Sequence, residues 1–131
     1  ANEDIQILDS FLEENGIEIY NENDIKIWCM GVREDIAGDS VIMLLIRNDR
    51  DLEIEIDPVE DTSSVNGIEM GVSAYGIDVS PNKYCIMEIE VSANYLETHD
   101  IKEITEASLY VEINDENYDE VANTTLYIKT K

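Results

Sequence analysis

The chain alternates apolar and polar residues over short stretches, and Asn, Asp, Gly or Pro interrupts the alternation at intervals of roughly eight to twelve residues. Clear examples are residues 52–56, 87–91 and 109–113. Because successive side chains on a strand point to opposite faces, a period of two places one face in a core and the other in water. Many strands of this kind at this spacing predict an antiparallel β-sandwich, an all-β fold.

Residue type at the interruptions predicts where strands end. Pro58 is expected to stop the strand that begins at Leu52, because proline cannot donate to a sheet ladder. Asn66-Gly67 predicts a two-residue hairpin, since Asn-Gly favours the positive φ angles of a type I′ turn. The expected strands are residues 17–20, 24–32, 40–48, 52–56, 77–79, 84–92, 107–114 and 124–130, with one short helical turn within 94–106.

The first residues follow a different pattern. Ile5, Leu8 and Leu12 have helical spacing, and Gly16 occupies the place of a left-handed C-cap. We therefore expect a short amphipathic helix at about residues 4–14, although Ile5 and Ile7 are also consistent with the start of a strand. This divides the chain into an N-terminal extension, 1–16, and one sandwich domain, 17–131.

The net charge is extreme: 31 acidic residues against eight basic ones give −23 at pH 7. Binding to nucleic acid requires Lys and Arg to neutralise phosphates, so this surface argues against a nucleic-acid partner. No apolar run approaches the ~18 residues of a membrane span, so we expect no membrane insertion by this chain. Cations or basic proteins are the partners that such a charge tolerates.

The order of several segments resembles a known kind of domain. These segments are "NDIKIWCMGV", "SVIMLLIRND", "SSVNGIEM", "DVSPNKY", "IKEITEASLYVEINDENYDE" and "LYIKTK", and they span residues 17–131. Together they resemble the small immunoglobulin-like β-sandwich domains of uncharacterised exported proteins and lipoproteins of low-GC Gram-positive bacteria. The resemblance implies an immunoglobulin-like sandwich of about seven to eight strands and an extracytoplasmic location, either secreted or anchored at the cell surface. It implies no active site.

Two cysteines and one histidine are the most reactive side chains in the sequence. By parity, Cys29 and Cys85 point inward, and in the immunoglobulin-like layout their strands are expected to be neighbours in one sheet. We expect two buried free thiols, with a disulfide as the alternative in an oxidising compartment. His99 lies beside Asp100, but no nucleophile motif accompanies it, so we predict no catalytic residues and no cofactor.

The turn before the last strand offers candidate calcium ligands. Asp115, Asn117 and Asp119 carry the hard oxygen atoms that calcium prefers. The turn lacks the Asp-x-Asp-x-Asp-Gly order of an EF-hand loop, so an acidic hairpin tip in water is the simpler interpretation.

Trp28 is the candidate for ligand stacking. It shares the nominally outer face of its strand with Lys26 and Met30, and an exposed tryptophan there could stack on a carbohydrate. The alternative, which we favour, is that the N-terminal helix covers the ring.

The sequence thus predicts a non-enzymatic exported or cell-surface module of unspecified function, serving in protein interaction or as a structural part. A carbohydrate- or calcium-binding module is the alternative.

Overall fold

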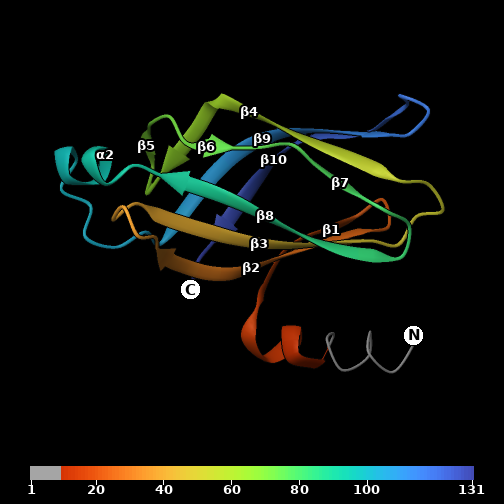
Figure 1. Ribbon diagram of the computed structural model, residues 1–131, viewed down its shortest axis with the longest axis horizontal. Helices are drawn as coiled ribbons and strands as arrows, with labels where there is room; N and C mark the ends of the chain where they lie inside the picture. Colours follow the sequence, from red (N-terminus) through yellow and green to blue (C-terminus); the bar gives the residue numbers. More distant parts are fainter. Residues whose placement is uncertain (1–9) are drawn as a thin grey trace.

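Two antiparallel sheets pack face to face in the computed structural model, which describes residues 10–131 (Figure 1). The predicted all-β sandwich is confirmed. Sheet A contains, in spatial order, β1 (Ile17–Glu22), β2 (Ile25–Glu34), β3 (Ser40–Asn48), β8 (Lys83–Val91) and β6 (Ser73–Ala74). Sheet B contains β10 (Glu120–Lys129), β9 (Glu106–Asp115), β4 (Ile54–Val65) and β5 (Ile68–Glu69), with β7 (Ile77–Val79) also paired to β4.

The strand order is that of an immunoglobulin-like sandwich. Strands β2, β3, β8 and β6 follow one another as A, B, E and D do in an immunoglobulin domain, and β4, β9 and β10 follow one another as C, F and G. Strand β1 is an addition, which forms a hairpin with β2 and extends sheet A by one strand.

The core lies between the sheets, where the inward faces of both meet. Ile27, Leu44 and Ile46 of sheet A are fully buried, and so are Val111 and Ile128 of sheet B. These positions follow from the alternation along each strand, because every second side chain faces the opposite sheet.

The N-terminal helix is confirmed for the part that the structure describes, residues 10–15; the expected residues 4–9 lie outside the described range. The amide of Gly16 donates to the carbonyl of Leu12, which ends the helix. The predicted left-handed C-cap is wrong, because the φ angle of Gly16 is not positive. Space is tight here: a Cβ atom would lie 3.0 Å from Met30 Sδ, 3.2 Å from the Leu12 carbonyl oxygen and 3.3 Å from Trp28 Cβ.

Pro58 does not end its strand, contrary to expectation. Strand β4 continues through Pro58, which pairs with Val111 of β9. On the other side of β4, β7 pairs only with residues up to Ile56, and β5 only with the last two residues. Pro58 therefore stands where β4 has a neighbour on one side alone, which a residue without an N–H tolerates.

The local turn chemistry is otherwise as predicted. Asn66 and Gly67 have φ angles of 50° and 80° and connect β4 to β5 as a type I′ hairpin requires. The first hairpin turn lies later than the predicted residues 21–23, because Asn23 and Asp24 are the residues with positive φ. The short helix α2 (Ala93–Thr98) lies within the expected range.

Candidate functional site

A cleft of about 520 Å³ lies at the end of the sandwich where β2 finishes and β3 begins. Val32, Leu96, Ile101 and Ile104 contribute apolar surface to its lining, and polar and charged residues make up the rest. The end of β2, α2, the connection from α2 to β9 and the last two residues of the chain surround the opening. The volume is in the range of natural ligand sites, which is roughly 300–1,000 Å³.

The cleft carries a disproportionate share of the basic side chains. Arg33, Lys102 and Lys131 all line it, and the whole chain has only eight Lys and Arg residues. Each forms an ion pair close by: Arg33 with Glu88 at 2.5 Å, Lys102 with Asp100 at 3.1 Å, and Lys131 with Glu103. With Glu34 also in the lining, three cations stand beside four acids here, whereas the whole chain has eight basic against 31 acidic residues.

The cleft lies beside a free strand edge. Strand β1 pairs with β2 only as far as the partners Ile17 and Cys29, whereas β2 continues to Glu34. Among residues 10–131, no strand pairs with the outer edge of residues 30–34, and Figure 1 shows the arrowhead of β2 extending past β1 at the border of sheet A. A bulge at Met30 marks the change, with Gly31 at a φ angle of 112°. Bulges of this kind are frequent at sheet edges.

Trp28 is buried, with only 5% of its surface exposed. The guanidinium of Arg47 and the ammonium of Lys26 lie 5.5 Å and 5.8 Å from its ring centroid, and the ring of Tyr84 is 6.5 Å away. Gly16, at the end of the N-terminal helical segment, approaches its Cβ atom. The ring is therefore buried beside two cations and Tyr84 and offers no open face for a sugar, and the favoured cover by the N-terminal helix stays a prediction.

In the acidic turn between β9 and β10, the first carboxylate accepts hydrogen bonds from main-chain amides of the same turn. Asp115 is buried, and its Oδ1 atom accepts hydrogen bonds from the amides of Asn117 at 2.8 Å and Asp119 at 3.2 Å. The amide of Asp115 also donates to the Asp119 carbonyl at 2.9 Å, which closes the turn. Asp115 thus has a structural task as a turn cap, which the sequence pattern alone does not reveal.

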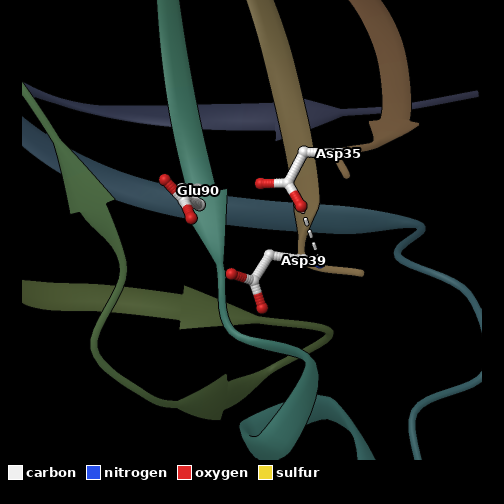
Figure 2. A group of neighbouring side chains, drawn as sticks. All are labelled: Asp35, Asp39 and Glu90. Carbon is white, nitrogen blue, oxygen red and sulfur yellow. Dashed lines mark hydrogen bonds between the residues drawn. The ribbon is translucent and has the colours of Figure 1, made fainter. Parts of the chain in front are cut away.

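A different acidic group gathers at the opposite end, beside α2. Side-chain oxygens of Asp35, Asp39 and Glu90 lie within 4.8 Å of one another, and Figure 2 shows them converging from the β2–β3 connection and β8. Asp35 accepts a hydrogen bond from the amide of Asp39 at 3.0 Å, and Asp39 accepts one from the amide of Ala93 at 2.9 Å. Two of the three carboxylates therefore already hold the turn and the start of α2.

The proximity of the three carboxylates changes the pKa of the third one, Glu90. A hydrogen bond with Asp39 raises the pKa of Glu90 above the ordinary value of 4.5, and the partial desolvation and the nearby charges of Asp35, Asp39 and Glu88 raise it further. Sequence reasoning missed this group because Glu90 is about fifty residues away from the other two, and only the pairing of β3 with β8 brings them together.

The two cysteines are free, but their strands are not neighbours as expected. Cys29 on β2 pairs with Leu44, Cys85 on β8 pairs with Ile46, and β3 lies between the two strands. Cys29 is buried, which raises the pKa of its thiol, whereas Cys85 is half-buried. Both cysteines face inward as predicted, but Cys85 is only half-buried against the core.

His99 is an exposed residue at the C-cap of α2. No helix among residues 10–131 is long and apolar enough to cross a membrane.

Comparison with known proteins leaves the function to be argued from these residues. No protein-family model matches the chain, and no curated protein matches it. Among solved structures, the chain is similar to a FixG-related protein from Vibrio parahaemolyticus, at 14% sequence identity and a TM-score of 0.40, over 82% of this chain and 97% of that one.

Proposed function

We propose that this chain is a non-enzymatic module of an exported or cell-surface protein and that it serves in protein interaction. One observation carries the proposal: the free edge of β2 at residues 30–34 lies beside the cleft. An unpaired edge presents main-chain donors and acceptors that another chain can pair with, and natural proteins usually cover or blunt such edges. Here the edge is joined to a recess that can accept side chains.

The net charge of the chain favours a protein partner over nucleic acid or an anionic lipid surface. A net charge of −23 disfavours nucleic acid and anionic lipid surfaces, since both are polyanions. The cleft, whose three cations stand beside the acids Glu34, Glu88, Asp100 and Glu103, is less strongly acidic than the chain as a whole.

Site-specific photo-cross-linking in the organism that makes the protein tests this function. A photo-reactive phenylalanine at position 32, beside the cleft, is expected to give one discrete protein adduct on irradiation. The same residue at position 118, where Tyr118 is exposed at the other end of the sandwich, is the matched control and is expected to give none. Absence of a position-32 adduct, or equal adducts at both positions, would refute the interaction role.

Protease treatment of intact cells tests the location. An exported or surface-anchored chain is digested while a cytoplasmic marker survives, and protection of the chain together with the marker would contradict the export proposal.

A further inference from the structure

We propose that the free edge of β2 accepts an extended segment of a basic partner as an added strand. Apolar side chains of this segment face the cleft, and lysine or arginine occupies the positions between them, which face the outer side of sheet A. This inference rests on the proposed interaction function and names the chemistry of its partner.

The main chain of the partner has a defined place next to β2. Strand β1 pairs with β2 only from Ile25 to Cys29, and β2 continues to Glu34. Among the described residues, the strand position beside residues 30–34 is empty (Figure 1). A segment of about five residues, roughly 17 Å long, fills a position of this length. The added strand continues the line of β1 within sheet A.

Apolar side chains suit the face of the added strand that looks toward the cleft. Val32 pairs with the fully buried Ile42, so its side chain lies on the inner face of the sheet, at the cleft. In the same lining Ile104 is buried, and Leu96 and Ile101 are half-buried. A strand paired with β2 directs every second side chain to this face, and contact there removes apolar surface from water.

The two lysines of the cleft are already compensated, so they do not select the charge of the partner. Lys102 pairs with Asp100 at 3.1 Å, and Lys131 pairs with Glu103. Glu34, which also lines the cleft, adds a further acid on this side. The cleft therefore gives no reason for a charge on the inward side chains of the partner.

The intervening side chains of an added strand point to the outer face of sheet A, which is acidic at this end. Arg33 points outward by the alternation along β2, and Glu88 pairs with it at 2.5 Å. Glu90 lies on the same face of β8 as Glu88, and its carboxylate lies within 4.8 Å of those of Asp35 and Asp39 (Figure 2). Arg33 thus stands beside Glu88 and near three further carboxylates.

Lysine and arginine are the side chains that this surface attracts. A hydrogen bond with Asp39, followed by desolvation and the charges of Asp35, Asp39 and Glu88, raises the pKa of Glu90 above 4.5, so negative charge is already crowded here. A cation on the added strand reduces this repulsion, and physiological salt weakens the attraction only beyond about 8 Å. The net charge of −23 acts in the same direction over longer distances.

A second copy of this chain is a poorer occupant than a basic segment. Two molecules of net charge −23 repel one another over their whole surfaces, whereas a basic segment is attracted to the same surface.

The binding test titrates the whole chain into end-capped, fluorescein-labelled seven-residue peptides at about 0.05 M salt, where screening is weak. The peptides are valine alternating with lysine, valine alternating with glutamate, and serine alternating with lysine. We expect the valine–lysine peptide to bind at least about tenfold more tightly than either of the others. Equal binding of the two lysine peptides would reduce the interaction to general charge attraction and overturn the proposal. Failure of all three to bind, or equal or tighter binding of the glutamate peptide, would also overturn it.

A matched pair of charge reversals separates local attraction from attraction by the net charge. Glu88→Lys changes an exposed acid on the outer face of sheet A, and Glu112→Lys makes the same change at an exposed position of β9 in sheet B. We expect the Glu88 variant to bind the valine–lysine peptide at least about threefold more weakly than the Glu112 variant does. Equal affinities of the two variants would contradict binding at the edge of β2.

Strand addition has its own signature, which leaves the protein unaltered. An edge strand hydrogen-bonds only through alternate residues of the added strand, so two valine–lysine peptides are compared, N-methylated at the valines or at the lysines. We expect one to lose binding and the other to retain it, with amide shifts at residues 30–34 in nuclear magnetic resonance spectra. Loss or retention in both, or shifts confined elsewhere, would contradict strand addition. Self-association of the chain in sedimentation, reversed by the peptide, would make a second copy the occupant and overturn the proposed partner.

The cross-linking test in cells and the peptide tests fail independently. A position-32 adduct without binding of the valine–lysine peptide would leave the interaction role standing and remove the basic partner. Peptide binding without an adduct in cells would remove the role and leave a chemical property of the edge.

Discussion

The two ends of the sandwich are built differently. At the end where β3 finishes, Asn48 is fully buried, and its Nδ2 atom donates to the carbonyls of Leu52 at 2.8 Å and Val79 at 2.9 Å. Its Oδ1 atom accepts from the amide of Arg50 at 2.9 Å, and its carbonyl accepts from the amide of Asn82 at 2.7 Å. The side chain thus ties the loop after β3 to the end of β7, the main chain of the same residue also holds the β7–β8 turn, and we call this the closed end.

Within residues 10–131, no buried polar side chain makes such a link at the other end. There β2 extends beyond β1, and the cleft separates its last residues from the connection between α2 and β9. At this open end Asp39 joins the β2–β3 turn to the start of α2, and Asn66 joins the β4–β5 turn to residues 103–106, so each of these links stays beside one sheet. The comparison indicates that stability is concentrated at one end and that unpaired main chain is available at the other, which is the usual division between scaffold and binding surface.

The largest expected effect is at the closed end. Asn48→Ala leaves the carbonyls of Leu52 and Val79 and the amide of Arg50 without their buried partner, so we expect a loss of about 2–4 kcal/mol in the free energy of unfolding. Urea titration measures it. At the open end, Ile101→Ala should cost less than about 1.5 kcal/mol, because this side chain is only half-buried. Equal losses for the two variants would contradict the contrast between the ends.

Asp115→Ala should have the next largest effect, also at the closed end. The variant loses the acceptor of the Asn117 and Asp119 amides, and we expect about 1–2 kcal/mol of destabilisation, as for the loss of a helix N-cap. Asp115→Asn keeps the Oδ1 acceptor and is the control. If Asn destabilises the protein as much as Ala does, charge rather than capping is the role of Asp115.

The fold could be predicted largely from alternation and turn chemistry, because each depends on neighbours in the sequence. The hairpin at Asn66-Gly67 and the inward face of β2 up to Cys29 are local properties and were correct. Pro58 was misinterpreted because its tolerance depends on which strands flank β4, and the sequence does not show that. The placement of Cys29 and Cys85 failed for the same reason, since β3 separates their strands.

The candidate site was harder to predict from the sequence than the fold was. Val32, Lys102 and Lys131 are far apart along the chain, and nothing in their spacing indicates a common cleft. The free edge of β2 begins where β1 stops pairing with it, and the sequence does not show the register between these two strands. The burial of Trp28, in contrast, was the favoured one of two alternatives, but the contacts of its ring with Arg47, Lys26 and Tyr84 were not anticipated.

A smaller effect is expected at the open end from Glu90→Gln. The folded state raises the pKa of Glu90, so folded protein binds this proton more readily than unfolded protein does, and wild-type stability falls as pH rises above about 4.5. Gln stays uncharged beside Asp39, so the variant should melt at a higher temperature than wild type at pH 7, with the gap closing as pH falls below 4.5.

Thermal melts between pH 4 and 8 measure this difference. Glu69→Gln, an exposed acid in sheet B, controls for the loss of one charge. A gap that is the same at every pH would exclude Glu90 as the titrating group.

The smallest expected effect is a difference in reaction rate between the two thiols. Cys85, half-buried in β8, should react with a disulfide reagent faster than the buried Cys29, whose raised pKa lowers its thiolate fraction. Two kinetic phases in the native state and two rapid equivalents in denaturant are expected. A single phase would refute the difference in accessibility, and an absence of reactive thiols in denaturant without reductant would demonstrate a disulfide.

Amide hydrogen exchange along β2, followed by nuclear magnetic resonance, tests the central claim most directly. Residues 25–29 have strands on both sides, whereas residues 30–34 have β3 alone. The account predicts slow exchange throughout 25–29 and fast exchange of the outward-pointing amides within 30–34. Uniformly slow exchange along all of β2 would contradict the free edge.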